Sequence, residues 1–408
     1  MMKIALLSIL SEIHDEERIN DSLKDKYQFL NNNFEITEIA VDEVADHDFS
    51  DYDLTINFIK SGGSEKNFAR IFEYLPQPVY LYAVELHNSL PAALEILSFV
   101  NARGAEAKIL HGENEDLLVE IKELIEYRRI RNKISEAKIG VIGKPSDWLI
   151  GSQVDREHAA QHWGTEFIDI EMEEVYSALK NIEQKEAEKV AEQYFIKAEK
   201  MLESSKADLI KAAEIYLALK KLAVDYDLDA LTIRCFDLVE KINNTGCLAL
   251  ALLNDEGITA GCEGDIAAVF TMYLAAQLTG ETPFMANPVK IDSKKDQINF
   301  AHCTVPLSIS EKFILRSHFE TGIGVGIQGI LRKEAVTVFK IGGAGLEQYF
   351  VAEGKIIENM NSQNACRTQI KVELPQSSDY FLSDAIANHH LIIAGHHAAK
   401  INHFLAKE

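Results

Sequence analysis

The chain up to about residue 135 alternates short apolar runs with segments of helical periodicity, and this alternation constrains the fold more than any other feature. Strands joined through helices pair in parallel, because a helical crossover returns the chain to the same end of the sheet. We therefore expect an α/β fold built on a doubly wound, mainly parallel sheet. Its strands are predicted at Lys3–Ile9, Phe34–Val41, Leu54–Ile59, Val79–Val84 and Ala107–Leu110.

A second α/β unit is predicted after the charged segment Glu126–Lys133, because Lys138–Gly143 starts a fresh strand. Glu166–Ile170 is expected to be the next strand. Residues 172–227 are rich in Glu, Lys and Ala and are predicted to form a long helical region with a solvated face. Further strands are predicted at Ala230–Ile233, Leu248–Leu253 and Ile258–Cys262.

Beyond about residue 300 the chain carries predicted strands without long intervening helices, at Gly322–Gly329, Ala335–Ile341 and Gln369–Leu374. This pattern favours an antiparallel sheet or a small barrel. The predicted domains are an N-terminal α/β domain over residues 1–136, a second α/β domain over 137–286 and a C-terminal β-rich, barrel-like domain over 287–408.

The composition fits two or three globular domains, since the 408 residues are 47% hydrophobic and 8% aromatic. The net charge of -23 argues against a nucleic acid partner, which needs clustered Lys and Arg, and against an anionic membrane surface. No apolar run reaches the ~18–20 residues that span a bilayer. Five cysteines without a CxxC pair, and an N-terminus without a signal-peptide core, predict a cytoplasmic protein with buried thiols.

Two carboxylates, Glu263 and Asp265, lie where the predicted strand Gly257–Cys262 gives way to an apolar helix. The helix is expected to run to about Gln277 and to end at Gly280, which suits the left-handed residue after a helix. The ordinary interpretation is a pair of capping acids, because the helix dipole favours negative charge at its N-terminus.

Residue types that bind metals follow this turn. Asn287 comes first, His302 ends the next predicted strand, and His389 belongs to a histidine cluster near the C-terminus. Carboxylate, amide and imidazole ligands favour Mn²⁺ or Mg²⁺ over a thiolate-bound metal. A zinc site is not expected, since the chain has no HExxH motif and no His/Cys zinc spacing. On spacing alone, His389 fits a metal ligand and an ordinary structural histidine equally well.

Short motifs are spread over nearly the whole chain: Gly62-Gly63, Asn88-Ser-Leu-Pro-Ala92, Cys262-Glu-Gly-Asp265, Thr271-Met272, Leu278-Thr-Gly280, Pro283-Phe-Met285, His302-Cys303, His318-Phe-Glu-Thr-Gly322, Cys366-Arg-Thr-Gln369, and Asn388-His389 with Gly395-His396. Together they resemble the L-fucose isomerase and L-arabinose isomerase superfamily, and most closely the shorter L-fucose isomerase-related proteins. The likeness is strong over residues 257–303 and looser elsewhere.

The resemblance implies a subunit of two α/β domains and a β-rich domain. It also implies a homo-oligomer, a trimer or a hexamer, in which a neighbour's first domain helps to close the site. Mn²⁺, with Mg²⁺ or Co²⁺ as alternatives, is expected to be held by Glu263, His302 and His389. Asn287 stands where the fucose isomerases have an aspartate. An amide oxygen can ligate a hard cation but cannot carry a proton, so Asn287 is expected to be a weak ligand or a substrate contact.

The implied function is aldose–ketose isomerisation, an intramolecular oxidoreductase reaction of carbohydrate metabolism that runs through an enediol. The expected substrate is a fucose-like or arabinose-like sugar, or a hexose with a charged substituent. The ion stabilises the enediolate charge, and a base must lie within ~3 Å of the migrating proton. Glu263 is the first candidate base. Asp265 is the second, although its position suits a helix-capping acid better. The second proton carrier stays open between a metal-bound water, Asp265 and a histidine.

Six further residues are candidate sugar contacts: Arg316, His318, Arg367, Gln369, Asn388 and Trp148. An arginine pair suits a sulfonate or a phosphate, whose oxygens guanidinium binds in a bidentate manner. Ordinary salt bridges explain the polar residues equally well, and a half-buried position explains Trp148.

Two other functions fit the same residues. Loss of the acid at Asn287 fits a non-catalytic sugar-binding or regulatory protein on the same fold. An enediolate also serves a lyase or an epimerase, and the fold does not separate these reactions from isomerisation.

Overall fold

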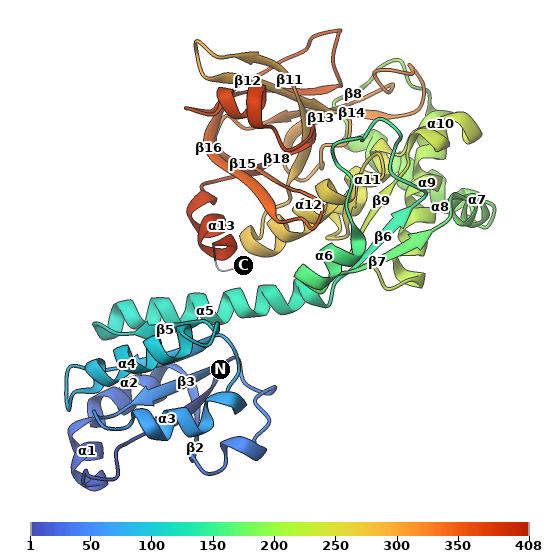
Figure 1. Ribbon diagram of the computed structural model, residues 1–408. Helices are drawn as coiled ribbons and strands as arrows, with labels where there is room; N and C mark the ends of the chain where they lie inside the picture. The colour runs from blue at the N-terminus through green and yellow to red at the C-terminus, as the bar shows by residue number, and fades with distance from the viewer. Residues whose placement is uncertain (1, 407–408) are drawn as a thin grey trace. The chain divides into compact units, whose positions relative to one another are not determined.

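The protein is represented by a computed structural model that describes residues 2–406 (Figure 1). The chain forms two compact units, the first ending at Arg131 and the second starting at Asn132. The three predicted domains, with a further boundary at residue 286, stay a prediction. Among the described residues, no helix combines the length and the apolar character needed to cross a membrane.

The first unit is built on a five-stranded parallel sheet of order β2-β1-β3-β4-β5. Side chains of β1 alternate between two hydrophobic clusters, Ile4 and Leu6 entering one, Ala5 and Leu7 the other. Both faces are therefore covered, as a doubly wound parallel sheet requires, and this prediction is confirmed. The strands are β1 (Lys3–Ile9), β2 (Glu35–Ile39), β3 (Leu54–Ile59), β4 (Val79–Ala83) and β5 (Ala107–Leu110), and the helices are α1 (Glu16–Ser22), α2 (Lys24–Asn33), α3 (Glu65–Ile71), α4 (Ser89–Asn101) and α5 (Asn114–Ser135).

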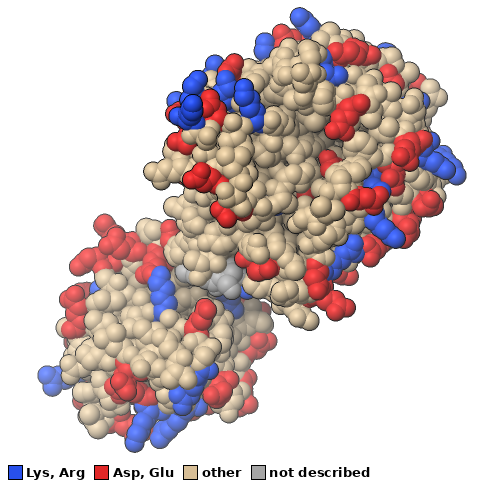
Figure 2. Space-filling view, turned by 45° about the horizontal axis from the view of Figure 1, so that its top comes forward, with Lys and Arg blue, Asp and Glu red and all other residues tan. Residues whose placement is uncertain are grey.

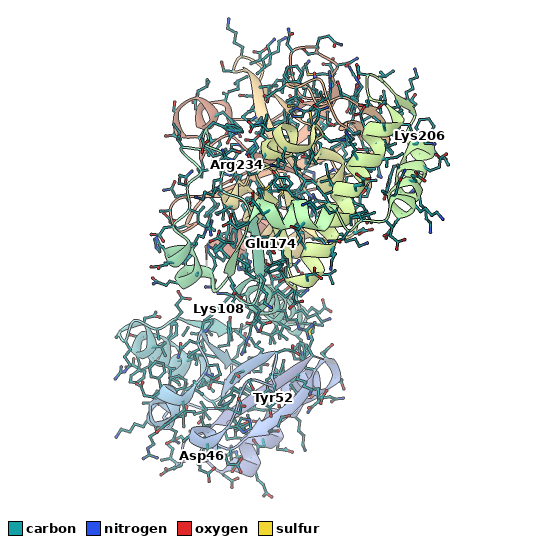
Figure 3. The ribbon with its side chains drawn as sticks, turned by 90° about the vertical axis from the view of Figure 1, so that its right-hand side faces the viewer. Asp46, Tyr52, Lys108, Glu174, Lys206 and Arg234 are labelled. Carbon is teal, nitrogen blue, oxygen red and sulfur yellow. The ribbon has the colours of Figure 1, made fainter. Side chains whose placement is uncertain are left out.

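The second unit contains a four-stranded parallel sheet of order β10-β9-β6-β7. Its strands are β6 (Lys138–Ile142), β7 (Glu166–Ile170), β9 (Ala230–Ile233) and β10 (Thr259–Gly261), and its helices are α6 (Arg156–Trp163), α7 (Met172–Leu179), α8 (Gln184–Lys197), α9 (Lys206–Asp225), α10 (Phe236–Ile242), α11 (Cys247–Asp255) and α12 (Ile266–Thr279). Lys206, at the start of α9 (Figure 3), pairs with Glu192 on α8 at 2.9 Å. This ion pair joins helix α8 to helix α9.

One sequence prediction in this region is wrong. Leu248–Leu253, expected to be a strand, belongs to helix α11. All eight residues from Cys247 to Asn254 are buried, so the segment shows no polar face, and a short apolar run of this kind looks alike as a strand or a helix. Residues 172–227 are mostly helical, as predicted, but they form α7, α8 and α9 instead of a continuous helix. The short strand β8 (Lys200–Met201) separates α8 from α9, which begins at a capping box between Ser205 and Asp208.

The rest of the second unit is a closed antiparallel barrel of order β11-β12-β17-β16-β15-β18. The prediction of an antiparallel sheet or a small barrel is therefore confirmed. The barrel strands are β11 (Phe284–Asp292), β12 (Gln297–His302), β15 (Ala335–Gly342), β16 (Gln348–Asn359), β17 (Thr368–Glu373) and β18 (His390–Ala394), and helix α13 (Ala398–Leu405) follows them. β13 (Ser310–Arg316) pairs with β14 (Gly326–Leu331) on one side and with β8 on the other, in a separate sheet. β14 starts four residues later than predicted.

The surface in Figure 2 carries Asp and Glu side chains over both units, with Lys and Arg scattered between them. The absence of a nucleic acid partner and of a membrane surface stays a prediction.

Candidate metal centre

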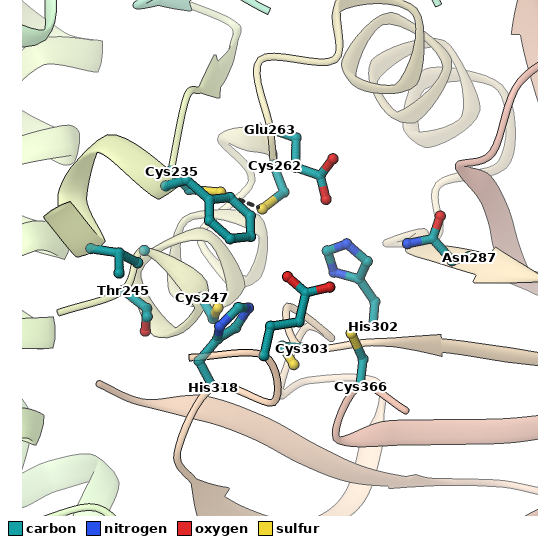
Figure 4. Close-up of a pocket in the computed structure, with 14 residues that line it drawn as sticks. Cys235, Thr245, Cys247, Cys262, Glu263, Asn287, His302, Cys303, His318 and Cys366 are labelled. Carbon is teal, nitrogen blue, oxygen red and sulfur yellow. Dashed lines mark hydrogen bonds between the residues drawn. The ribbon is translucent and has the colours of Figure 1, made fainter. Parts of the chain in front are cut away.

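A pocket lies where the carboxyl ends of β9 and β10 meet the first strands of the barrel (Figure 4). Acidic, imidazole, amide and thiol side chains line it. Its lining residues are Cys235, Phe236, Val239, Thr245, Gly246, Cys247, Cys262, Glu263, Asn287, His302, Cys303, His318, Glu320 and Cys366.

A tight turn between β10 and α12 points Glu263 into this pocket. Glu263 has a φ of 65°, in the left-handed region that side chains rarely adopt, so the surrounding contacts must hold it there. Its carbonyl accepts a hydrogen bond from Ser146, and the next residue, Gly264, donates one to Ile233. A Cβ at Gly264 would lie 2.7 Å from the Lys144 carbonyl oxygen, so only glycine fits.

Glu263, His302 and His389 each offer one ligand atom, and these atoms lie within 4.8 Å of one another. His302 is the last residue of β12, and His389 immediately precedes β18. The imidazole rings lie 5.5 Å apart, and Nε2 of His389 lies 3.6 Å from Oε1 of Glu263. The structure thus brings together the three residues that the sequence analysis chose as metal ligands.

The other nitrogen of each imidazole has its own partner. Nδ1 of His389 lies 2.8 Å from the carboxylate of Asp265, and both side chains are fully buried. Nδ1 of His302 lies 2.8 Å from the hydroxyl of Thr304. A metal-binding histidine commonly has its second nitrogen fixed in this way. Within residues 2–406, Nε2 of His389 is buried without a hydrogen-bond partner, so it is free to be a ligand.

The donor set therefore fits a divalent cation. One carboxylate oxygen and two imidazole nitrogens suit Mn²⁺ and related borderline ions, and each of the three side chains is held by a further hydrogen bond.

Charges around the group shift its pKa values. Burial alone would raise the pKa of Glu263, but the His389 imidazole and the Trp148 indole lower it to about 2. Burial likewise opposes the shift at His389, whose pKa the carboxylates of Asp265 and Glu263 raise to about 9. Burial, together with the neighbouring His389, lowers the pKa of His302 to about 3. At neutral pH the metal-free group is therefore an ionised glutamate, a neutral His302 and a charged His389.

A buried lysine lies behind this group. Lys340, on β15, is fully buried, and its Nζ has no hydrogen-bond partner among the residues described. Burial lowers the pKa of Lys340, and the charge of Asp265 opposes that shift. Burial also disfavours the ionised form of Asp265, but the charges of Lys340 and His389 outweigh it and lower the pKa of Asp265 to about 2.

Asp265 is the N-cap of α12, where its carboxylate accepts a hydrogen bond from the backbone N–H of Ala268. The helix-capping interpretation of Asp265 is therefore confirmed, and Gly280 ends the helix in the left-handed conformation, as predicted. With one oxygen on Ala268 and the other on His389, the side chain is occupied and is absent from the pocket lining.

Three other candidate residues lie beside Glu263. Asn287 lines the pocket, and its side-chain oxygen accepts a hydrogen bond from Asn388 at 3.1 Å. The indole N–H of Trp148 donates to Glu263 at 2.6 Å, while its ring packs edge-on against Phe236 at 5.0 Å. The Trp148 side chain is half exposed, so one of its sides is open to a ligand.

The remaining predicted sugar contacts are His318, Arg367, Arg316 and Gln369, and the last three side chains already hydrogen-bond to other protein groups. His318 lines the pocket, and Arg367, whose charge lowers the pKa of His318 together with burial, lies close to it. Arg367 donates to the backbone oxygen and the hydroxyl of Ser317. Arg316 is buried and holds Glu203 with both Nε and Nη2. The amide of Gln369 bonds backbone groups of residues 362, 365 and 366.

Among the lining residues that were not predicted, Glu320 is the only carboxylate. Glu320 lies within the motif His318-Phe-Glu-Thr-Gly322 but was not chosen as a site residue. Burial, together with the charge of Glu263, raises the pKa of Glu320. A carboxyl group with a raised pKa in a pocket is a candidate acid or base. Its position in the sequence, two residues after the candidate His318, could have identified Glu320 as a further site residue.

The charge on His389 should make the metal-free protein sensitive to alkaline pH. Because its folded pKa of about 9 exceeds the ordinary 6.5, its stabilising contribution is complete below pH 6.5 and is lost as the pH rises through 9. We expect the free energy of unfolding of chelator-treated protein to fall by on the order of 1–3 kcal/mol over this range, as measured by urea denaturation.

Two histidine variants control this measurement. His396, which is exposed and pairs with Glu353, can be replaced by glutamine without removing the fall. His389→Gln should be less stable at pH 6.5 and should lack the fall. An equal fall in His389→Gln would contradict the assignment.

The sequence was also compared with those of known proteins and protein families. No model of a protein family matches the sequence. A sulfoquinovose isomerase of Priestia megaterium (strain ATCC 12872 / QMB1551) is 26% identical over 254 residues, which are 57% of this chain and 55% of the relative. One from Clostridium sp. (strain MSTE9) is 25% identical over 312 residues, 70% of this chain and 66% of the relative. The match thus spans about half the length of the Priestia protein. It supports a sugar isomerase family, and does not single out the L-fucose isomerase superfamily.

Proposed function

We propose that this protein is a metal-dependent aldose–ketose isomerase whose substrate is a sugar with an anionic substituent, sulfoquinovose being the first candidate. The observation that carries the proposal is the group of Glu263, His302 and His389, whose ligand atoms converge within 4.8 Å at a polar pocket. The likeness to proteins named sulfoquinovose isomerase supports both the reaction and the substrate.

Glu263, His302 and His389 would hold Mn²⁺, and the side-chain oxygen of Asn287 would be a fourth, weaker ligand. The ion, when bound, supplies Lewis-acid stabilisation of the negative charge that develops on the sugar oxygens. Asp265 positions His389 for this task, because its hydrogen bond to Nδ1 leaves Nε2 facing Glu263. Asp265 is thus a positioning residue in this proposal, in place of a proton carrier.

Glu320 is the proposed proton carrier that compensates for Asn287. Glu263 has a pKa of about 2, so at neutral pH it is ionised and serves as the negatively charged member of the ligand set. The raised pKa of Glu320 brings its titration nearer to working pH, which is where a general acid or base is most effective. Glu320 and Glu263 line the same pocket, so a sugar bound there would be close to both carboxyl groups.

Arg367 is the proposed contact for the anionic substituent. It follows the lining residue Cys366 in the chain and lies near His318, which also lines the pocket. Its side chain donates to two neutral oxygens of Ser317. Arg316, by contrast, already pairs with a carboxylate, that of Glu203. Trp148 and Asn388, beside Glu263 and Asn287, are positioned to contact the sugar itself. The homo-oligomer, the cytoplasmic location and the identity of the metal stay predictions.

The first test is proton exchange at C2 of sulfoquinovose in D₂O, followed by NMR with metal-stripped and Mn²⁺-loaded protein. We expect exchange and ketose formation only with metal, because the enediolate charge needs stabilisation. Glu263→Gln should lower the rate by at least about 100-fold and weaken Mn²⁺ binding.

The control for this variant is Asp147→Asn, which changes an exposed carboxylate in the neighbouring loop and should leave the rate unchanged. Metal-independent exchange, or near-normal turnover by Glu263→Gln, would remove the proposed function. Sugar binding without exchange would indicate a binding protein, and a shorter carbonyl product would indicate a lyase.

A second test addresses Glu320. Glu320→Gln should lower kcat by about 10²–10⁴-fold and leave Mn²⁺ affinity unchanged, because the side chain carries a proton and is no ligand. Loss of one limb of the pH–rate profile should accompany the change. Glu311→Gln, in the exposed part of β13, is the matched control. If Glu320→Gln keeps its kcat, another group carries the proton.

A third test addresses substrate charge. Arg367→Met should raise KM for sulfoquinovose by about 10–100-fold, the value of a lost charge-assisted hydrogen bond, and change KM for D-glucose by less than about threefold. Arg332→Met, at an exposed position beyond β14, is the control. Equal losses for both sugars would show that Arg367 acts only on the structure of the pocket.

A further inference from the structure

All five cysteines of the chain line the candidate pocket, although they come from distant parts of the sequence: Cys235, Cys247, Cys262, Cys303 and Cys366 (Figure 4). None is in a disulfide. Four are buried, but each borders the pocket, so a small solute that enters it meets their sulfur atoms. A ligand set of oxygen and imidazole nitrogen needs no thiols, and the proposed isomerisation uses none.

One pair stands in direct contact. The Sγ atoms of Cys235 and Cys262 lie 3.1 Å apart (Figure 4). A disulfide requires about 2.05 Å, so the two sulfurs must approach by about 1 Å to form the bond. Cys262 follows β10 and Cys235 lies two residues beyond β9, at adjacent strands of the parallel sheet, which keeps the pair in place.

Both cysteines are linked to the carboxylate of Glu263. Cys262 precedes Glu263 in the tight turn, where Thr232 and Asp265 donate hydrogen bonds to the Cys262 carbonyl. Cys235 precedes Phe236, whose ring contacts Trp148, and Trp148 holds the carboxylate of Glu263. A displacement of the Cys262 sulfur therefore shifts Glu263 through the backbone that joins them. A displacement of the Cys235 sulfur shifts it through the rings of Phe236 and Trp148.

We propose that Cys235 and Cys262 are an oxidation site, at which a hydroperoxide converts the two thiols to a disulfide and thereby displaces Glu263 and weakens metal binding. The second half of this inference rests on the proposed metal centre. The first half, the modification itself, does not.

The chemistry balances with one hydroperoxide for each disulfide. One sulfur, as its thiolate, attacks a peroxide oxygen and the O–O bond breaks; a sulfenic acid forms, and the departing oxygen takes up the thiol proton and leaves as water or an alcohol. The second thiol then attacks the sulfenic sulfur, the S–O bond breaks, and the departing hydroxyl takes up the second thiol proton and leaves as water. Two electrons pass from the thiols to the peroxide, and a reducing dithiol reverses the change.

The experiment treats the full chain with hydrogen peroxide and follows two quantities. Peptide mapping by mass spectrometry is expected to find a Cys235–Cys262 disulfide and the loss of two alkylatable thiols. Mn²⁺ affinity, from the change in tryptophan fluorescence on titration with Mn²⁺, should fall about tenfold or more, since residues that orient ligands have effects of this size. Dithiothreitol should restore both.

Three variants separate the pair from the other thiols. Cys235→Ser should keep its Mn²⁺ affinity after peroxide treatment, and Cys235→Ala gives the same test if a buried hydroxyl prevents folding. Cys247→Ser, which changes a thiol of the same pocket outside the contact pair, should respond like the unaltered protein. A bond between Cys303 and Cys366, or oxidation of single thiols only, would overturn the assignment.

The two proposals can fail separately. A mapped Cys235–Cys262 bond with unchanged Mn²⁺ affinity would overturn the coupling to Glu263. If the reduced protein binds no Mn²⁺, the proposed function fails, while the mapping still decides whether the oxidation site exists.

Discussion

The hydrogen bond between His389 and Asp265 is the contact on which the rest of the candidate site depends. It joins residues 124 positions apart, at 2.8 Å and without access to solvent. Through it, the N-terminus of α12, which follows strand β10 of the parallel sheet, is tied to the residue that immediately precedes β18 of the barrel. Removal of one partner of a buried charged pair leaves the other uncompensated, at a cost of about 3–5 kcal/mol. The same bond fixes the orientation of the His389 ring, so stability and ligand geometry are inseparable here.

Sequence patterns predicted the parts of this structure that depend on local periodicity. The alternation of strands and helices, the cap at Asp265 and the end of α12 at Gly280 are all set within one or two turns of chain. The features that these patterns missed have a different origin. Helix α11 is buried on all sides, and its periodic signal is therefore absent. The separation of α8 from α9 depends on β8, whose two residues form a strand only because β13 is there to pair with it.

The candidate site was predictable in its residue types and much less so in their partners. Glu263, His302 and His389 were chosen through a resemblance, and the structure brings them together. That Arg316 is occupied by Glu203 could not be predicted, because 113 residues separate the two. Lys340 gave no signal either, since a lysine within an apolar strand looks like a surface residue until the barrel encloses it.

The place of β18 in the barrel has a consequence for biosynthesis. Among the described residues β18 is the final strand, and it closes the barrel by pairing with β11 through Phe284 and Ile392 and with β15 through Val336 and Ala394. Synthesis therefore delivers Glu263 and His302 well before His389. Until β18 joins the barrel, Asp265 has no imidazole partner and one of the three candidate ligands is missing. The proposed metal ion would thus meet its full ligand set only after the barrel has closed.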